Sequence, residues 1–153
     1  MGIRSVWRRF SGRDAAAELD PARTDLVVVA SSFDDAEACS TALARAMDWR
    51  APETAVLRHH LRIPAALRDA VVAIAAQDGY SPAEPSAGAG PAAAAADSSA
   101  AGHIELVLQR VQVLDALHCA QECSRMAGLA QRHEGTALGW DALQPSRSGE
   151  PGR

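Results

Sequence analysis

An internal repeat constrains the fold of this 153-residue chain more than any other feature. When the segment that begins at Asp25 is shifted forward by eighty positions, it matches a second segment without a gap. The matching pairs are Leu26 with Leu106, Val27 with Val107, Asp35 with Asp115, Ala36 with Ala116, Cys39 with Cys119 and Arg45 with Arg125. Each copy has the pattern of a β-branched strand, an acidic helix start and an apolar helix stripe. The repeat therefore predicts two related strand–helix units.

The first copy predicts a strand, a helix and a second strand. The run DLVVVASSF, from Asp25, is typical of a buried strand. A helix is expected over 34–49, with Asp34 and Asp35 at its start. Its core stripe would be Ala36, Cys39, Leu43 and Ala46. A second strand over 53–64 ends at a proline, and a further helix over 64–80 would be capped by Gly79.

The second copy predicts a strand over 103–114, a helix over 115–134 and a final strand over 136–143. The stretch LAQRHEGTALGWDAL, from Leu129, has the composition of a helix end followed by a strand start. Gly135 is predicted to be the left-handed residue that ends the helix. Gly139 is predicted to allow a bend or a close approach beside Trp140.

Two strand–helix–strand units joined by a connection predict an α+β, ferredoxin-like split βαβ fold, with one antiparallel sheet and its helices on one face. Residues 64–102 would be an insertion, comprising the extra helix and a disordered Pro/Ala/Gly-rich loop over 81–102. The single domain would span 25–144, between a flexible basic tail over 1–24 and a disordered tail over 145–153. The basic tail also fits a short amphipathic helix that docks on a membrane surface or an acidic partner.

Charge and composition exclude several classes of function. The net charge of −4 and the pI of about 5.7 argue against direct binding to nucleic acid. No apolar run reaches the roughly 18 residues of a membrane span, and the N-terminus lacks the apolar core of a signal peptide. Three cysteines without scaffold-like spacing predict reduced thiols and a cytoplasmic location.

The cysteines do not have the spacing of a metal-binding motif. Cys119 and Cys123 share one helix face, whereas His118 points about 100° away from Cys119. Because Cys39 holds the equivalent position in the first copy, small core residues explain all three thiols. The sequence thus predicts no metal site and no cofactor. No nucleophile–base order, phosphate-binding loop or pair of carboxylates is present either, so we expect a protein that is not an enzyme.

Alternation along the second strand separates two sets of side chains. Leu57, His59, Leu61 and Ile63 would face the helices, while Arg58, His60 and Arg62 would lie on the open face of the sheet. Such a row is either a solvated polar face or a partner-binding surface, because Arg often dominates interfaces. Trp140 would join the surface if the last strand lay at the sheet edge; otherwise it would be a core side chain. The predicted partner-binding residues are Arg58, His60, Arg62 and Trp140.

The segment RVQVLDALHCAQECSRMAGLAQRHEGTALGWDAL resembles part of the ribonuclease E inhibitor family (regulator of ribonuclease activity B). Members carry a strand, a helix with a pattern like M-x-x-L-A, a turn and a G-W strand, and these features fall here on Met126, Leu129, Ala130, Gly139 and Trp140. SSFDDAEACSTALARAM is similar to the opening strand and helix of that family. This chain departs from the family in its basic N-terminus, its inserted loop and its lack of a long acidic C-terminal tail.

The resemblance implies a small non-catalytic regulator that binds the large RNA-degrading endonuclease of a bacterial cell. We therefore expect a protein-interaction module with a protein partner, and whether it also forms a homodimer stays open. The alternative is a ferredoxin-like domain that senses a small molecule at the edge or the open face of the sheet. Ligand-induced thermal stabilisation would separate the alternative from partner binding.

Overall fold

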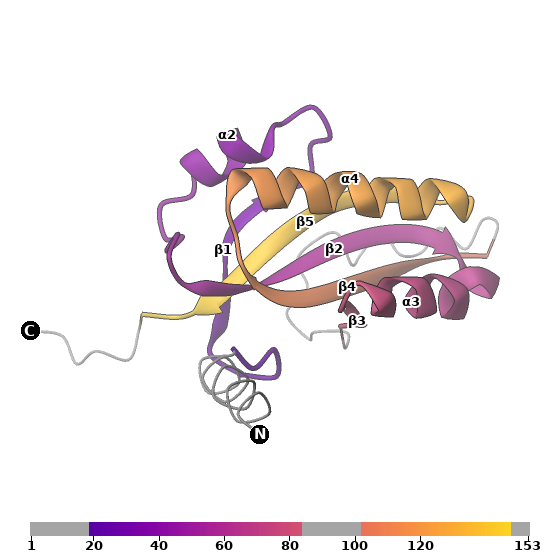
Figure 1. The fold of residues 1–153 in the computed structure, drawn as a ribbon, viewed down its shortest axis with the longest axis horizontal. Coiled ribbons are helices and arrows are strands. Elements are labelled where there is room, and N and C mark those ends of the chain that lie inside the picture. The colour runs from indigo at the N-terminus through magenta and orange to yellow at the C-terminus, as the bar shows by residue number, and fades with distance from the viewer. Residues whose placement is uncertain (1–18, 84–101, 148–153) are drawn as a thin grey trace, which may run out of the picture.

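A computed structural model describes residues 19–83 and 102–147 of the chain. Within these ranges the protein is an α+β fold with one antiparallel sheet in the order β1-β5-β2-β4-β3, as Figure 1 shows. This confirms the predicted α+β class. The strands are β1 Leu26–Ser32, β2 Thr54–Pro64, β3 Ser81–Pro82, β4 His103–Val113 and β5 Thr136–Pro145.

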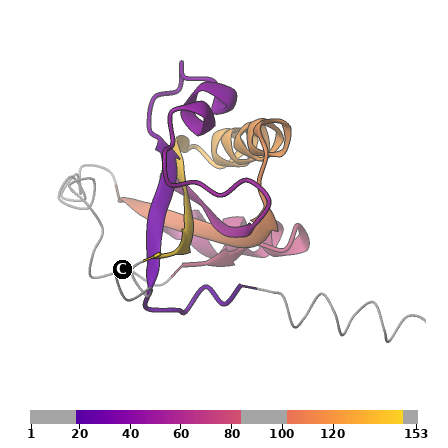
Figure 2. The same cartoon turned by 90° about the vertical axis from the view of Figure 1, so that its left-hand side faces the viewer.

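The described helices pack on one face of the sheet, and Figure 2 shows α2 and α4 together on that side. They are α2 Cys39–Ala44, α3 Arg68–Gln77 with a preceding 3₁₀ turn at Ala65–Leu67, and α4 Ala116–Arg132. Two core clusters fill the space between the layers. One joins α2, α4 and the β1 end of the sheet through residues that include Leu43, Leu57 and Trp140. The other joins α3, α4, β2 and β4 through residues that include Val71, Met126, Leu61 and Leu108.

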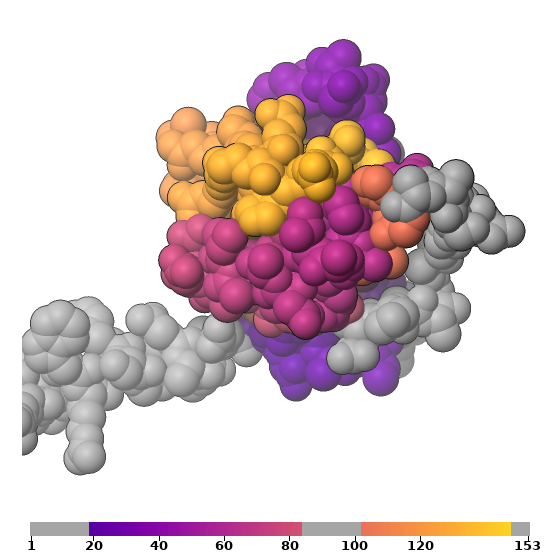
Figure 3. Space-filling model, turned by 90° about the vertical axis from the view of Figure 1, so that its right-hand side faces the viewer, coloured from indigo at the N-terminus to yellow at the C-terminus, as the bar shows by residue number. Residues whose placement is uncertain are grey.

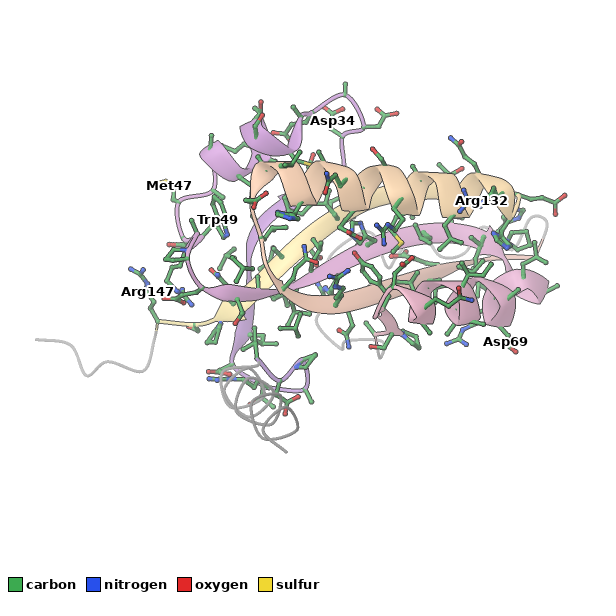
Figure 4. The ribbon with its side chains drawn as sticks, viewed as in Figure 1. Asp34, Met47, Trp49, Asp69, Arg132 and Arg147 are labelled. Atoms are coloured by element: carbon green, nitrogen blue, oxygen red, sulfur yellow. The ribbon has the colours of Figure 1, made fainter. Side chains whose placement is uncertain are left out.

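Helix α2 is much shorter than the sequence predicts. The segment from 34 to 38 forms a turn instead, in which the Asp34 carboxylate accepts a hydrogen bond from the Ala36 backbone N–H at 2.9 Å. Ser32 donates to Glu37 across the same turn at 2.5 Å. These local bonds compete with helix formation, so the helix begins only at Cys39, with Ala38 at its N-cap and no side-chain cap. Figure 4 shows Asp34 on this turn, above α4.

In the second copy the predicted cap is present. Asp115 accepts a hydrogen bond from the His118 backbone N–H at 2.8 Å, which starts the seventeen-residue helix α4. Gly79 has φ +83°, as expected for a left-handed residue after α3. The prediction for Gly135 was wrong, because the left-handed residue after α4 is Glu134, at φ 58°.

At Gly135 and Gly139 neighbouring atoms lie so close to the backbone that there is no room for a side chain. A Cβ on Gly135 would collide with the Arg62 carbonyl oxygen and lie 2.7 Å from Ile63 Cγ2. Figure 3 shows the yellow C-terminal part of the chain directly against the magenta part, whose colour covers the end of β2 and α3. A Cβ on Gly139 would collide with the Phe33 ring and lie 2.6 Å from the Ser32 carbonyl oxygen, so the predicted close approach at Gly139 is confirmed.

Three predicted boundaries are corrected by packing. Leu19, assigned to the tail, is buried against Val56 and Leu143 on the open side of the sheet. Ser81 and Pro82, assigned to the loop, pair with Gln109 and Leu108. At the C-terminal end β5 continues to Pro145, which pairs with Leu26. Residues 1–18 of the predicted N-terminal tail, residues 84–101 of the predicted loop and residues 148–153 of the predicted C-terminal tail lie outside the described residues.

Candidate functional site

Strand β2 presents its two faces as the alternation predicts. Leu57, His59, Leu61 and Ile63 are buried under the helices, whereas Arg58, His60 and Arg62 are only partly buried, on the face that no described helix covers. This side of β1, β5, β2 and β4, opposite to the described helices, is called the open face below.

The open face carries a charge network centred on Asp141 of β5. Arg58 donates two hydrogen bonds to the Asp141 carboxylate, at 2.6 and 2.7 Å. The His60 ring lies between two carboxylates, with Nε2 3.1 Å from Asp141 and Nδ1 3.0 Å from Glu105. The Phe33 ring packs edge-on against the His60 ring, with 5.1 Å between the two ring centroids. Arg58 and His60 are therefore held within the fold.

Ionisation follows from these contacts. Burial lowers the pKa of His60, but its hydrogen bonds to Asp141 and Glu105 outweigh burial, and the net pKa lies above its usual value. Burial raises the pKa of Asp141, but bonds from His60 and Arg58 outweigh it and leave this pKa below its usual range. Arg62 differs from both neighbours, since no hydrogen bond or ion pair joins its side chain to another described residue.

Trp140 does not belong to this surface. Strand β5 lies between β1 and β2 rather than at the sheet edge, and Trp140 points to the helix side. There it is 4% exposed and packs in the cluster with Leu43 and Leu57. Because the last strand is not at the sheet edge, Trp140 is a core side chain and not part of the proposed binding surface.

The sequence did not predict a thiol cluster on the helix side. Cys39 begins α2, and Cys119 and Cys123 lie one turn apart on α4, which packs against α2. Their three Sγ atoms lie within 4.8 Å of one another, and Cys39 Sγ is 3.8 Å from Cys123 Sγ. Cys39 and Cys119 are buried, and Cys123 is partly buried.

His59 extends the cluster from the sheet below. It is 2% exposed and lines a pocket together with Cys39 and Cys123. Its Nε2 is 3.5 Å from the Tyr80 hydroxyl, which donates to the Glu122 carboxylate at 2.6 Å. A chain of polar groups thus runs from Glu122 through Tyr80 to His59, which lines the same pocket as Cys123.

The thiols have unequal acidity. Interaction with Cys119, and then with His59, outweighs burial and lowers the pKa of Cys123 to about 5. The bond to Cys123, together with burial, raises the pKa of Cys119, and burial raises that of Cys39. One thiolate is therefore favoured at Cys123, where the cluster meets a pocket.

That pocket, called the thiol pocket below, has a volume of about 400 Å³. Its lining includes Cys39, Cys123, His59 and Trp140, and Asp34, Asp35 and Glu37 also line it. Hydrogen bonds from Arg45 and Ser32 lower the pKa of Glu37 to about 2, which keeps this carboxylate ionised. The acidic lining favours entry of cations.

A signal for the cluster was present in the repeat. Cys39 and Cys119 are equivalent positions, and the predicted pairing of the two helices on one face brings equivalent stripes together. The buried positions agree with the predicted core role of the thiols. Their convergence with His59 depends on the register of β2 beneath α4, which the sequence does not reveal.

Comparison with known proteins identifies no relative, since no protein-family model, characterised protein or solved structure matches the chain. Among the described residues, no helix has both the length and the apolar character needed to cross a membrane.

Proposed function

We propose that the protein is a non-catalytic regulatory module that binds a protein partner through the open face, with an RNA-degrading endonuclease as the first partner to test. The ribonuclease-inhibitor resemblance suggests this partner. The residues that carry the resemblance are mostly structural in this fold: Met126, Leu129, Ala130 and Trp140 are buried, and Gly139 allows close packing. A shared core supports a shared fold, so recognition of the partner belongs to surface residues.

The single observation that carries the proposal is the ordered row on the open face. Arg58 and His60 are fixed by carboxylates, while the neighbouring Arg62 cation has no partner among the described residues. Half-buried Val107 of β4 pairs with His60, and the half-exposed Phe33 ring packs against the same histidine. A rigid polar row next to apolar side chains, with one unpaired guanidinium, is suited to bidentate binding of a carboxylate on a partner.

The test compares Arg62→Ala with Arg68→Ala. Arg68 is an exposed arginine at the start of α3, on the helix side, and forms only a weak pair with Asp69. Binding to the purified endonuclease and cleavage of a reporter RNA would be measured together with thermal stability. We expect Arg62→Ala to weaken binding by roughly tenfold at unchanged stability, since a central interface arginine contributes more than about 1 kcal/mol. Equal binding by both variants would refute the role of the open face.

A second candidate, a small-molecule sensor, is favoured by the thiol pocket, whose volume suits a small ligand. A ligand panel that raises the melting temperature by several degrees, without any effect on nuclease binding, would favour this candidate.

We also propose that the fold is a variant of the ferredoxin-like split βαβ arrangement. Strands β1 and β2 run parallel with β5 between them, and β4 and β5 run parallel with β2 between them. Each strand–helix–strand unit is thus split by one strand of the other, which supports a variant of the ferredoxin-like arrangement. An experimental structure with a different strand order would refute it.

A further inference from the structure

The three cysteines offer the donor atoms of a tetrahedral metal site. Zinc–sulfur bonds of about 2.3 Å place two ligands of a tetrahedral ion roughly 3.8 Å apart. The Cys39 and Cys123 sulfurs are 3.8 Å apart, and no pair in the cluster exceeds 4.8 Å. Small side-chain rotations would therefore bring all three sulfurs to one ion.

His59 lines the same pocket as Cys39 and Cys123, and a rotation of its side chain would bring a ring nitrogen to an ion held by the thiols. Its Nε2 is 3.5 Å from the Tyr80 hydroxyl, which leaves Nδ1 as the nitrogen that can bind an ion. In zinc sites the second nitrogen of a histidine ligand usually donates to a carboxylate or another acceptor, which fixes the ring. Here Tyr80 and Glu122 provide this support through the 2.6 Å hydrogen bond between them.

We propose that the three thiols of the cluster and His59 bind one thiophilic metal ion, with Zn²⁺ as the occupant. Thiolate and imidazole donors in tetrahedral geometry select zinc over magnesium or calcium, which prefer oxygen ligands. Two helices and the central strand β2 supply the ligands. The ion would therefore join both copies of the repeat.

The pocket gives an ion access to this cluster. Small core cysteines alone would pack against apolar atoms, whereas Cys39, Cys123 and His59 all line the same hollow. Carboxylates of the β1–α2 turn line it as well, so a cation meets favourable charge on its path. Zinc would be the specific ligand of the sensor candidate, whereas the nuclease-binding test at Arg62 does not depend on it.

Cobalt substitution tests the proposal directly. The full-length protein would be reduced, stripped of metal with a chelator and titrated with Co²⁺ under anaerobic conditions. We expect thiolate-to-cobalt charge-transfer absorption and intense visible bands that saturate at one ion per chain and disappear when Zn²⁺ is added. Absence of charge-transfer absorption in the reduced, folded protein would overturn the proposal and leave the cluster as core thiols.

Variants then assign the ligands. Cys39→Ser and His59→Gln should each weaken zinc binding by more than roughly a hundredfold, and Tyr80→Phe by about tenfold through loss of ligand orientation. His118→Gln is the matched control, because His118 is exposed and bonds only to Asp115. Unchanged affinity in Cys39→Ser would overturn the assignment.

If a variant fails to fold, alkylation of the wild-type protein tests whether the thiols bind zinc. Zinc should protect the thiols from iodoacetamide, as read by peptide mass spectrometry, and equal labelling with and without zinc would contradict the site.

Discussion

Replacement of Asp141 by asparagine tests whether the charge network organises the open face. Asp141 is 5% exposed and accepts two hydrogen bonds from Arg58 and one from His60. Asn has the same shape but no charge, and its nitrogen cannot accept a hydrogen bond. The substitution therefore leaves Arg58 and His60 facing a neutral group, while the packing of the strand is kept.

The expected loss in the free energy of unfolding follows from the burial of the Asp141 carboxylate. Removal of one member of a buried ion pair typically costs about 3–5 kcal/mol. Asn retains one acceptor oxygen, and the Arg58 side chain is 19% exposed, so water can partly replace the lost bond. We therefore expect the free energy of unfolding to fall by about 2–3 kcal/mol, measured by urea denaturation. Asp69→Asn is the control, because the Asp69 side chain is 98% exposed and should cost less than about 0.5 kcal/mol.

The pH dependence has a definite sign. His60 has a raised pKa in the folded protein, so its contribution is complete below its unfolded value near 6.5 and is lost as the pH rises through the folded pKa. Glu105, Arg58 and Phe33 also face the ring and are unchanged by the substitution. The difference between wild type and Asp141→Asn should therefore be larger at about pH 6 than at about pH 9.

Two outcomes would refute this reasoning. A loss no larger than that of Asp69→Asn would mean that Arg58 and His60 are fully satisfied by water. A larger difference at the higher pH would mean that protonated His60 does not depend on the Asp141 carboxylate.

Three other substitutions test the packing. Trp140→Ala should lower the free energy of unfolding by about 3–5 kcal/mol in urea titrations, because a buried indole is removed; a variant of full stability would contradict the core role. Gly139→Ala should cost about 1–3 kcal/mol in the same assay, since the new methyl group meets Phe33 and the Ser32 carbonyl. Glu134→Gly should stabilise the protein by about 0.4–1 kcal/mol in calorimetry, because the residue has φ 58°; destabilisation would show that its side chain contributes more than the strain.

Patterns governed by local chemistry were predicted well. Apolar alternation in β2 identified both faces of the strand, and Asp115 identified the start of α4. Helix α2 was overestimated because the Ser32–Glu37 and Asp34 bonds favour a turn over 34–38. Gly135 was misassigned because close approach to β2 and a left-handed cap require the same residue type, and only the tertiary structure separates them.

The candidate sites depend on which strands and helices are neighbours in space, and the residue pattern of the sequence does not show this. Asp141 and Glu105 surround His60 only because β5 and β4 are its neighbours in the sheet. The thiols were identified as buried side chains, but their meeting with His59 depends on how α2 and α4 cross β2. Trp140 was left between two roles because its role depended on strand order, which propensity does not determine.

The central place of β5 has a consequence for the order of folding during synthesis. Leu26, in the first described strand, pairs with Pro145, and β1 has no strand neighbour besides β5 in the part of the chain that the structure describes. A ribosome therefore releases β1 and β2 long before the strand that joins them exists, although β2 and β4 can already pair. Contacts so distant in sequence form slowly, and an unpaired apolar strand promotes aggregation. We expect nascent chains that stop before residue 136 to leave β1 unprotected and to depend on chaperones until translation is complete.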